Sequence, residues 1–167
     1  MPRRWKRPSP GCYKINTDAS TDYLNSRVGV GAIIHNDQGL VMATSSYRIN
    51  SGLAVVNAEA MAILSGIQLA WEVGIHLIVV ESDSKQVVNL LNGVGNSITD
   101  LGMIVNSILN HPSRSHIRSF SFSPRVSNTT AHALSRLALD LDEMVVWMEE
   151  VPDSLHHIVL ADCHGSL

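Results

Sequence analysis

Three carboxylates stand at points where the sequence changes from one pattern to another. Asp18 lies late in the alternating stretch "CYKINTDAS", Glu59 opens the helical stretch "AEAMAILSGI", and Asp83 ends the apolar run "LIVVESD". Carboxylate oxygens with open positions are the ligands that Mg²⁺ and Mn²⁺ prefer. If these acids met, they could hold divalent ions that activate a water against a phosphodiester.

Each acid also has a simpler explanation when it is taken alone. One acid at the end of a strand is common, and Ser82 or Asp83 could cap the helix that follows. The metal-site hypothesis therefore depends on whether the fold brings the three positions together.

Hydrophobic periodicity predicts the elements that would position the acids. Alternation at 13–19, 28–34 and 40–49 predicts three strands joined by tight turns. Helical spacing follows from Ala58 to Val73, and the near-continuous apolar run at 75–82 is typical of a central strand buried on both faces. Two more helices, the alternating "HIRSFSFSP" and a last helix after Asn128 complete the order βββαβααβα.

This order predicts an α/β fold in which a mixed five-stranded sheet carries helices on both faces. Hairpins impose antiparallel pairing, whereas right-handed helical crossovers impose parallel pairing. If the strand at 75–82 returns beside the strand at 13–19, Asp18 and Asp83 lie at the same end of two parallel neighbours. Glu59 begins the helix between these strands, so we expect the three acids to meet.

Length and composition predict one globular domain with terminal additions. The chain has 167 residues, of which 45% are hydrophobic and 16% charged, so it can bury a substantial core. We predict a flexible, basic and Pro-rich arm at residues 1–10, the main domain at 11–142, and an extension at 143–167 that packs on the domain or trails from it. The net charge of -3 argues against a strongly basic nucleic-acid clamp.

The cysteines and the apolar segments bear on the compartment. Cys12 and Cys163 form neither a disulfide framework nor a metal-ligand spacing, which favours a reducing environment. No stretch has the length of a membrane span, and the start lacks the apolar region of a secretory signal. We therefore expect a soluble, intracellular protein with no membrane partner. Composition does not distinguish a nuclear from a cytoplasmic protein, and it does not indicate an oligomeric state. We take the protein to be a monomer.

Several motifs, in this order, resemble the ribonuclease H (RNase H) type 1 family and, within it, the plant reverse-transcriptase-like branch. They span nearly the whole chain: "GCYKINTDAS", "VGVGAIIHNDQG", "AEAMAILSGIQLAWEVG", "VVESDSKQVVNLL" and "SNTTAHALSRLAL". The resemblance implies an RNase H-like fold and a retroelement-related endonuclease that hydrolyses the RNA strand of RNA/DNA hybrids. It also implies two divalent ions, with Mg²⁺ as the cofactor. Because imidazole suits Mn²⁺ better than Mg²⁺, His132 would favour Mn²⁺.

The same resemblance implies the site residues. Asp18 would bridge both ions, while Glu59 and Asp83 would each ligate them from one side. His132 occupies the position at which bacterial members carry a fourth aspartate, so it would complete the catalytic and metal-binding set. Polar and basic residues near these positions would contact the substrate, including the 2′-hydroxyls that distinguish RNA from DNA: Ser20, Asn57, Ser84, Lys85, Arg125 and Asn128.

Two other classes of protein share some of these features. A catalytically weak or inactive RNase H-like module that binds nucleic acid or protein is one alternative, because fold does not guarantee activity and His132 replaces an acid. An aspartyl phosphotransferase also places an Asp after a hydrophobic strand, but it needs a second Asp two residues on, where Ser20 stands. Cleavage that requires a metal and a hybrid substrate would separate the nuclease from both.

Overall fold

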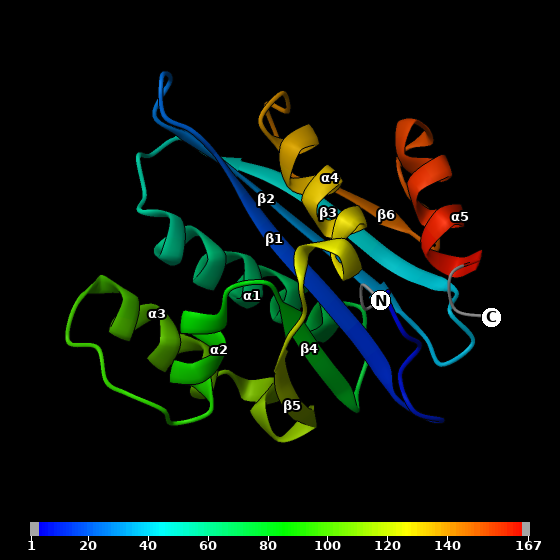
Figure 1. The fold of residues 1–167 in the computed structure, drawn as a ribbon, viewed down its shortest axis with the longest axis horizontal. Helices are drawn as coiled ribbons and strands as arrows, with labels where there is room; N and C mark the ends of the chain where they lie inside the picture. The colour runs from blue at the N-terminus through cyan, green and yellow to red at the C-terminus, as the bar shows by residue number, and fades with distance from the viewer. Residues whose placement is uncertain (1–3, 165–167) are drawn as a thin grey trace.

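The computed structural model describes residues 4–164, which form a mixed sheet with helices on both faces (Figure 1). In this part of the chain the sheet has six strands, in the order β5-β4-β1-β2-β3-β6. The parallel pairs are β1–β4 and β4–β5, and the other neighbours are antiparallel. The strands are β1 (Tyr13–Asp22), β2 (Arg27–His35), β3 (Val41–Ile49), β4 (Ile78–Ser82), β5 (Ile117–Phe122) and β6 (Val145–Met148).

The strand β6 corrects the prediction of a five-stranded sheet. It lies within the segment expected to form a C-terminal extension, and it pairs with β3 from Ala43 opposite Met148 to Ser46 opposite Val145. A strand of four residues is too short to show a reliable alternation in the sequence. Its formation depends instead on the free edge of β3, which only the assembled sheet provides.

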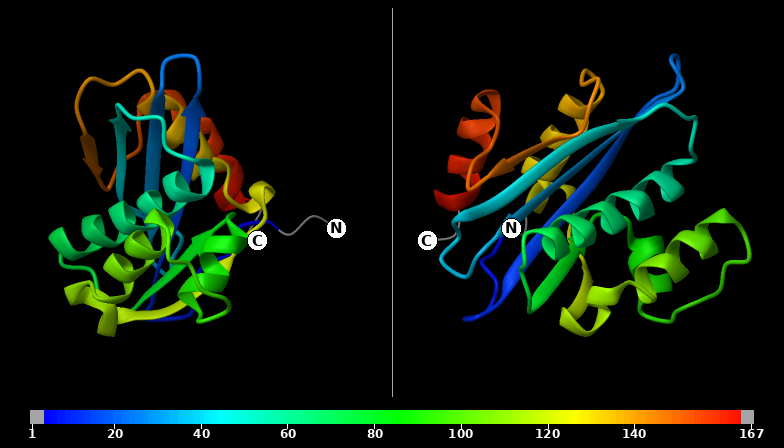
Figure 2. Two further views of the ribbon diagram at one scale, coloured as in Figure 1. Left: turned by 90° about the vertical axis from the view of Figure 1, so that its left-hand side faces the viewer. Right: turned by 180° about the vertical axis from the view of Figure 1, so that it is seen from behind.

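The helices are distributed over both faces of the sheet, as predicted (Figure 2). The first three pack on one face, and the last two lie on the other: α1 (Val55–Glu72), α2 (Lys85–Leu91), α3 (Asp100–Leu109), α4 (Thr129–Ala138) and α5 (His156–His164). Short 3₁₀ turns connect them at η1 (Pro112–His116), η2 (Arg125–Ser127) and η3 (Asp153–Leu155). The main core lies between the sheet and α1, α2 and α3, and a second core lies under α4 and α5.

Glycines allow the two central helices to approach the sheet closely. A Cβ atom at Gly31 of β2 would lie 2.5 Å from the backbone N of Ser135 in α4. On the opposite face, a Cβ at Gly66 of α1 would lie 2.8 Å from the Thr17 side chain of β1. Real Cβ atoms do not come so close to other atoms, so glycine is required at both contacts. These contacts bring α1 against β1 and α4 against β2, on opposite faces of the sheet.

The start of the chain packs on the domain instead of forming a free arm from residue 4 onward. Trp5 is only 3% exposed, and its indole N–H donates to Asn16 Oδ1 at 3.0 Å. The ring lies 4.4 Å from the ring of His35, centroid to centroid. Burial of so large an aromatic side chain offsets the entropy lost when the segment is ordered. The prediction of a flexible arm did not anticipate this contact.

The end of the described chain also packs on the domain. Val151, Leu155 and Val159 are buried together with Ile33 and Leu134. The expected extension therefore contributes β6, η3 and α5 to the folded unit, while the boundary at residue 142 stays a prediction. Among residues 4–164, no helix combines the length and the apolarity needed to cross a bilayer.

Candidate active site

The three predicted acids lie together at one end of the β1–β4 pair. Thr17 and Ser82 are the last residues paired between these parallel strands, so Asp18 and Asp83 follow at the same level. Glu59 lies near the start of α1, which packs against β1. Each acid offers a carboxylate oxygen, and these atoms lie within 4.8 Å of one another. The convergence expected from the order of the elements is therefore present.

Burial and mutual repulsion disfavour ionisation of Glu59 and Asp83 in this acid cluster. Asp18 is 0% exposed and Glu59 is 7% exposed. Burial, followed by repulsion from Asp18 and Asp83, raises the pKa of Glu59 to about 9. Burial and repulsion from Asp18 also raise the pKa of Asp83 to about 6, although the nearby Arg125 guanidinium opposes this shift. Glu59 therefore holds a proton at neutral pH unless a cation replaces it, whereas Asp83 becomes protonated only below about pH 6.

Two oxygens of the cluster have no hydrogen-bond partner within the described chain. They are Asp18 Oδ1 and Glu59 Oε2, and both are buried. A buried acceptor without a partner is costly, and such atoms are uncommon in folded proteins. A hard divalent cation would satisfy both oxygens and offset the repulsion, so the donor set fits Mg²⁺ or Mn²⁺.

The raised pKa values lead to a prediction about stability without metal. A carboxyl whose folded-state pKa lies above its unfolded-state pKa binds more protons when folded, so its stabilising contribution is lost as pH rises. Glu59 loses its stabilising contribution between about pH 4.5 and about pH 9, and Asp83 loses its own between about pH 3.8 and about pH 6. We expect the melting temperature of the metal-free protein to fall between pH 5 and 8 by several degrees, on the order of 5 °C, in thermal unfolding monitored by circular dichroism.

Added Mg²⁺ should counter this loss more strongly at pH 8 than at pH 6, because protons compete with the cation for the same oxygens. Glu59→Gln cannot titrate at this position and is the matched control. Its melting temperature should depend less on pH and respond less to Mg²⁺. An equal response of both proteins to Mg²⁺ at both pH values would contradict a cation site at Glu59.

His132 faces the acid cluster from α4. Its Nδ1 lies 2.7 Å from Asp18 Oδ2, and its side chain is 30% exposed. An ionised carboxylate only accepts hydrogen bonds, so Nδ1 carries a proton when Asp18 is charged, and in the neutral imidazole Nε2 then keeps a lone pair. His132 therefore touches the acid cluster without adding a negative charge to it.

Four of the six residues predicted to contact substrate surround the acid cluster at the surface. Arg125 is exposed, and its Nε lies 3.8 Å from Asp83 Oδ2. Ser84 follows Asp83 and is half-buried, Lys85 is exposed in the first turn of α2, and Asn57 is half-buried in the first turn of α1. The structure thus places polar and cationic groups beside the acids.

The other two, Ser20 and Asn128, are buried and bind within the protein. The hydroxyls of Ser20 and Ser135 share a hydrogen bond of 2.6 Å, and the Asn128 side-chain amide donates to the backbone oxygen of Thr17 at 2.9 Å. Asn128 occupies the N-cap position of α4 but makes no side-chain cap there. Both contacts fasten α4 to β1, and so they set the position of His132 relative to Asp18.

Ser135 is a partner in this arrangement that was not predicted from the sequence. It lies three residues after His132, so both occupy one face of α4. This spacing was the available signal, and Ser135 Oγ also bonds to the backbone oxygen of His132 at 2.7 Å.

Comparison with known proteins gives the same fold. The RNase H1 of Halobacterium salinarum NRC-1 aligns with a TM-score of 0.70 and 22% identity, over 78% of this chain and 98% of that one. LC11-RNase H1, solved in complex with an RNA/DNA hybrid, aligns with a TM-score of 0.69 and 21% identity, over 77% and 96%. The N-terminal RNase H domain of a Mycobacterium tuberculosis protein, solved as a fusion with maltose-binding protein, aligns at 0.64 with 25% identity, over 77% and 94%. The chain therefore has the RNase H fold.

The sequence itself defines the family more closely. Residues 16–138 match the family described as reverse transcriptase-like. The chain belongs to this reverse transcriptase-like family. No curated protein matches it significantly.

Proposed function

We propose that this protein is a divalent-metal-dependent endonuclease that hydrolyses the RNA strand of RNA/DNA hybrids. The observation that carries the proposal is the approach of Asp18, Glu59 and Asp83 to within 4.8 Å, with buried oxygens that lack partners in the described chain. Family membership and the RNase H fold support it, as does the hybrid bound to the structural neighbour LC11-RNase H1.

In this proposal the three acids and His132 hold two ions, Mg²⁺ or Mn²⁺. When bound, such ions generate a hydroxide nucleophile from water at neutral pH and stabilise charge on the leaving oxygen. Asp18 interacts with both other acids and with His132, so it would be the carboxylate shared by the whole ligand set. Glu59, which carries a proton at neutral pH without a cation, would have to lose it to act as a ligand.

The surrounding residues would hold the substrate in place. Arg125, beside Asp83, can turn its exposed guanidinium to a phosphate, and Lys85 offers a second positive charge. Asn57 and Ser84 flank the acids and can form hydrogen bonds with 2′-hydroxyls, which only RNA carries. Ser20 and Asn128 act indirectly in this proposal, because they position α4.

An assay with end-labelled nucleic acids tests the proposed activity. The purified protein is incubated with an RNA/DNA hybrid, double-stranded RNA or double-stranded DNA, each with Mg²⁺, Mn²⁺ or EDTA. We expect cleavage of the RNA strand of the hybrid alone, with either metal and not with EDTA. Cleavage in EDTA, or equal cleavage of all three duplexes, would reject the proposal.

A catalytically weak module that binds nucleic acid is the second candidate. One observation favours it: the imidazole of His132 is hydrogen-bonded to Asp18 Oδ2, an oxygen that a metal would use. The same substrates separate the two functions, because the module would bind hybrid without cutting it in any metal.

A further inference from the structure

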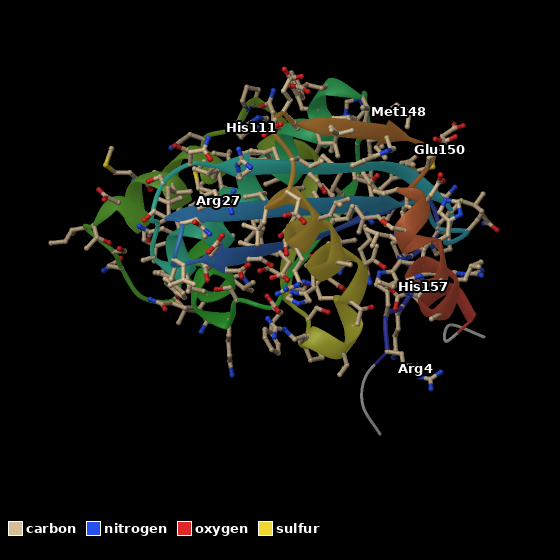
Figure 3. All side chains as sticks on the ribbon, turned by 90° about the horizontal axis from the view of Figure 1, so that it is seen from above. Arg4, Arg27, His111, Met148, Glu150 and His157 are labelled. Atoms are coloured by element: carbon tan, nitrogen blue, oxygen red, sulfur yellow. The ribbon has the colours of Figure 1, made fainter. Side chains whose placement is uncertain are left out.

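A cavity of about 650 Å³ opens beside the acid cluster, between the N-terminal segment, η2, α4 and α5. His132 contributes to its wall, and the same side chain contacts Asp18 at 2.7 Å. Figure 3 shows Arg4 and His157, two residues of the wall, at the same end of the molecule beside α5. A cavity of this volume is on the scale of small-ligand sites, so it admits about one or two nucleotides and not a duplex.

The terminal segments of this chain build much of the cavity. Arg4, Trp5, His157 and Ile158 all line it, and all lie outside the residues 16–138 that match the family. The cavity therefore lies between the family-matching part of the chain, which contributes η2 and α4, and the segments on either side of it.

The charges along the wall suit an anion. Arg4, Arg125 and Arg136 contribute three guanidinium groups. Arg4 and Arg136 are exposed, and neither guanidinium group has a hydrogen bond or an ion pair within the described residues. Among the residues of the wall, the one carboxylate is Asp162, which accepts hydrogen bonds from the hydroxyls of Thr129 at 3.0 Å and Thr130 at 2.6 Å. Positive charge in a concave site attracts phosphates.

The remaining wall is apolar. Val126, Ala133, Ile158 and Ala161 line it together with the indole of Trp5. Apolar surfaces between cationic groups suit nucleotides, because the bases pack on the apolar parts while the phosphates meet the arginines. In a duplex the base faces are hidden by stacking, so this wall is matched to unpaired nucleotides.

We propose that this cavity binds an unpaired extension of the RNA strand, so that the preferred substrate is a hybrid that continues into single-stranded RNA. The inference rests on the proposed function for the identity of the cleaved strand. The extension leaves the acid cluster past His132, its phosphates meet Arg4 and Arg136, and its first unpaired bases pack against the apolar wall.

Binding measurements in EDTA test the cavity separately from catalysis. Fluorescence anisotropy is recorded with labelled hybrids of one duplex length that are blunt, carry a short RNA extension at the 5′ or the 3′ end, or carry the same extension on the DNA strand. We expect an RNA extension of one polarity to bind about tenfold more tightly than the blunt hybrid. The double variant Arg4→Gln, Arg136→Gln should lose this gain and keep its affinity for the blunt hybrid.

Arg114→Gln is the matched control, because Arg114 is exposed on η1 and does not line the cavity. It should keep the full increase in affinity that the RNA extension gives. The inference would be overturned by equal affinity for blunt and extended hybrids, by an increase in affinity from the DNA extension alone, or by an increase that persists in the double variant. If the RNA extension strengthens binding through Arg4 and Arg136 but no hybrid is cut in any metal, the cavity assignment holds and the proposed activity fails. If hybrids are cut but extensions bind no better, the activity holds and the cavity assignment fails.

Discussion

Asp18→Asn should lower kcat/KM for hybrid cleavage by about a thousandfold or more, equivalent to ~4 kcal/mol of transition-state stabilisation. Asp18 is fully buried in the acid cluster. One of its carboxylate oxygens is hydrogen-bonded to His132, and the other has no partner in the described chain. An amide offers one neutral oxygen in place of two charged ones, so it binds hard cations poorly. The measurement is cleavage of end-labelled hybrid under single-turnover conditions in Mg²⁺.

The same variant should fold normally. It removes one charge from a cluster in which repulsion already raises the pKa of Glu59 and of Asp83, so the metal-free protein should melt at the same or a higher temperature. Asp22→Asn is the matched control, because it makes the same change on β1 in a residue bonded to Arg27 and Asn25. The control should retain cleavage, and undiminished cleavage by Asp18→Asn would rule out the proposed site.

Replacement of His132 should change the choice of metal. Imidazole is a poorer ligand than carboxylate for Mg²⁺ and a better one for Mn²⁺, so the natural protein should be more active with Mn²⁺. His132→Asp restores an all-oxygen site and should increase Mg²⁺-supported cleavage by about tenfold. His132→Ala loses the contact to Asp18 and should reduce cleavage by about 10- to 100-fold in both metals. The rates are compared in Mg²⁺ and Mn²⁺ with one hybrid.

His76→Ala provides the control for this series, because His76 is exposed beside His116 and does not belong to the site. It should cut hybrid as the natural protein does. If His132→Asp, His132→Ala and the natural protein cut equally in both metals, His132 has no catalytic part. If none of them cuts under any condition, the binding-module function replaces the nuclease.

Hydrophobic periodicity was sufficient to predict the central elements of the fold. The strands β1 to β4 and the helix α1 each carry a local pattern, and the turn after α1 has Gly74 at a φ of 74°, where glycine is favoured. Once the order of these elements is known, the rules of strand connection place β1 beside β4. The meeting of Asp18, Glu59 and Asp83 could therefore be expected from the sequence alone.

The orientation of polar side chains was decided by tertiary contacts. Ser20 and Asn128 were expected to face substrate, yet they bind Ser135 and Thr17 inside the protein, at sequence separations of 115 and 111 residues. A serine or an asparagine has no periodic signature that distinguishes a surface loop from a helix contact. Their direction follows from how closely α4 approaches the sheet, and this depends on glycines in another element.

The order of the elements and the convergence of the acids could be predicted from the sequence, because local periodicity and the rules of strand connection are sufficient for both. The sixth strand, the burial of Trp5 and the cavity between the N-terminal segment and α5 could not, and they are seen only in the folded protein. Each of these joins segments that are distant along the chain and have weak patterns of their own. The free energy that stabilises these contacts comes from burying apolar surface, and that surface can be buried only after the central sheet has formed.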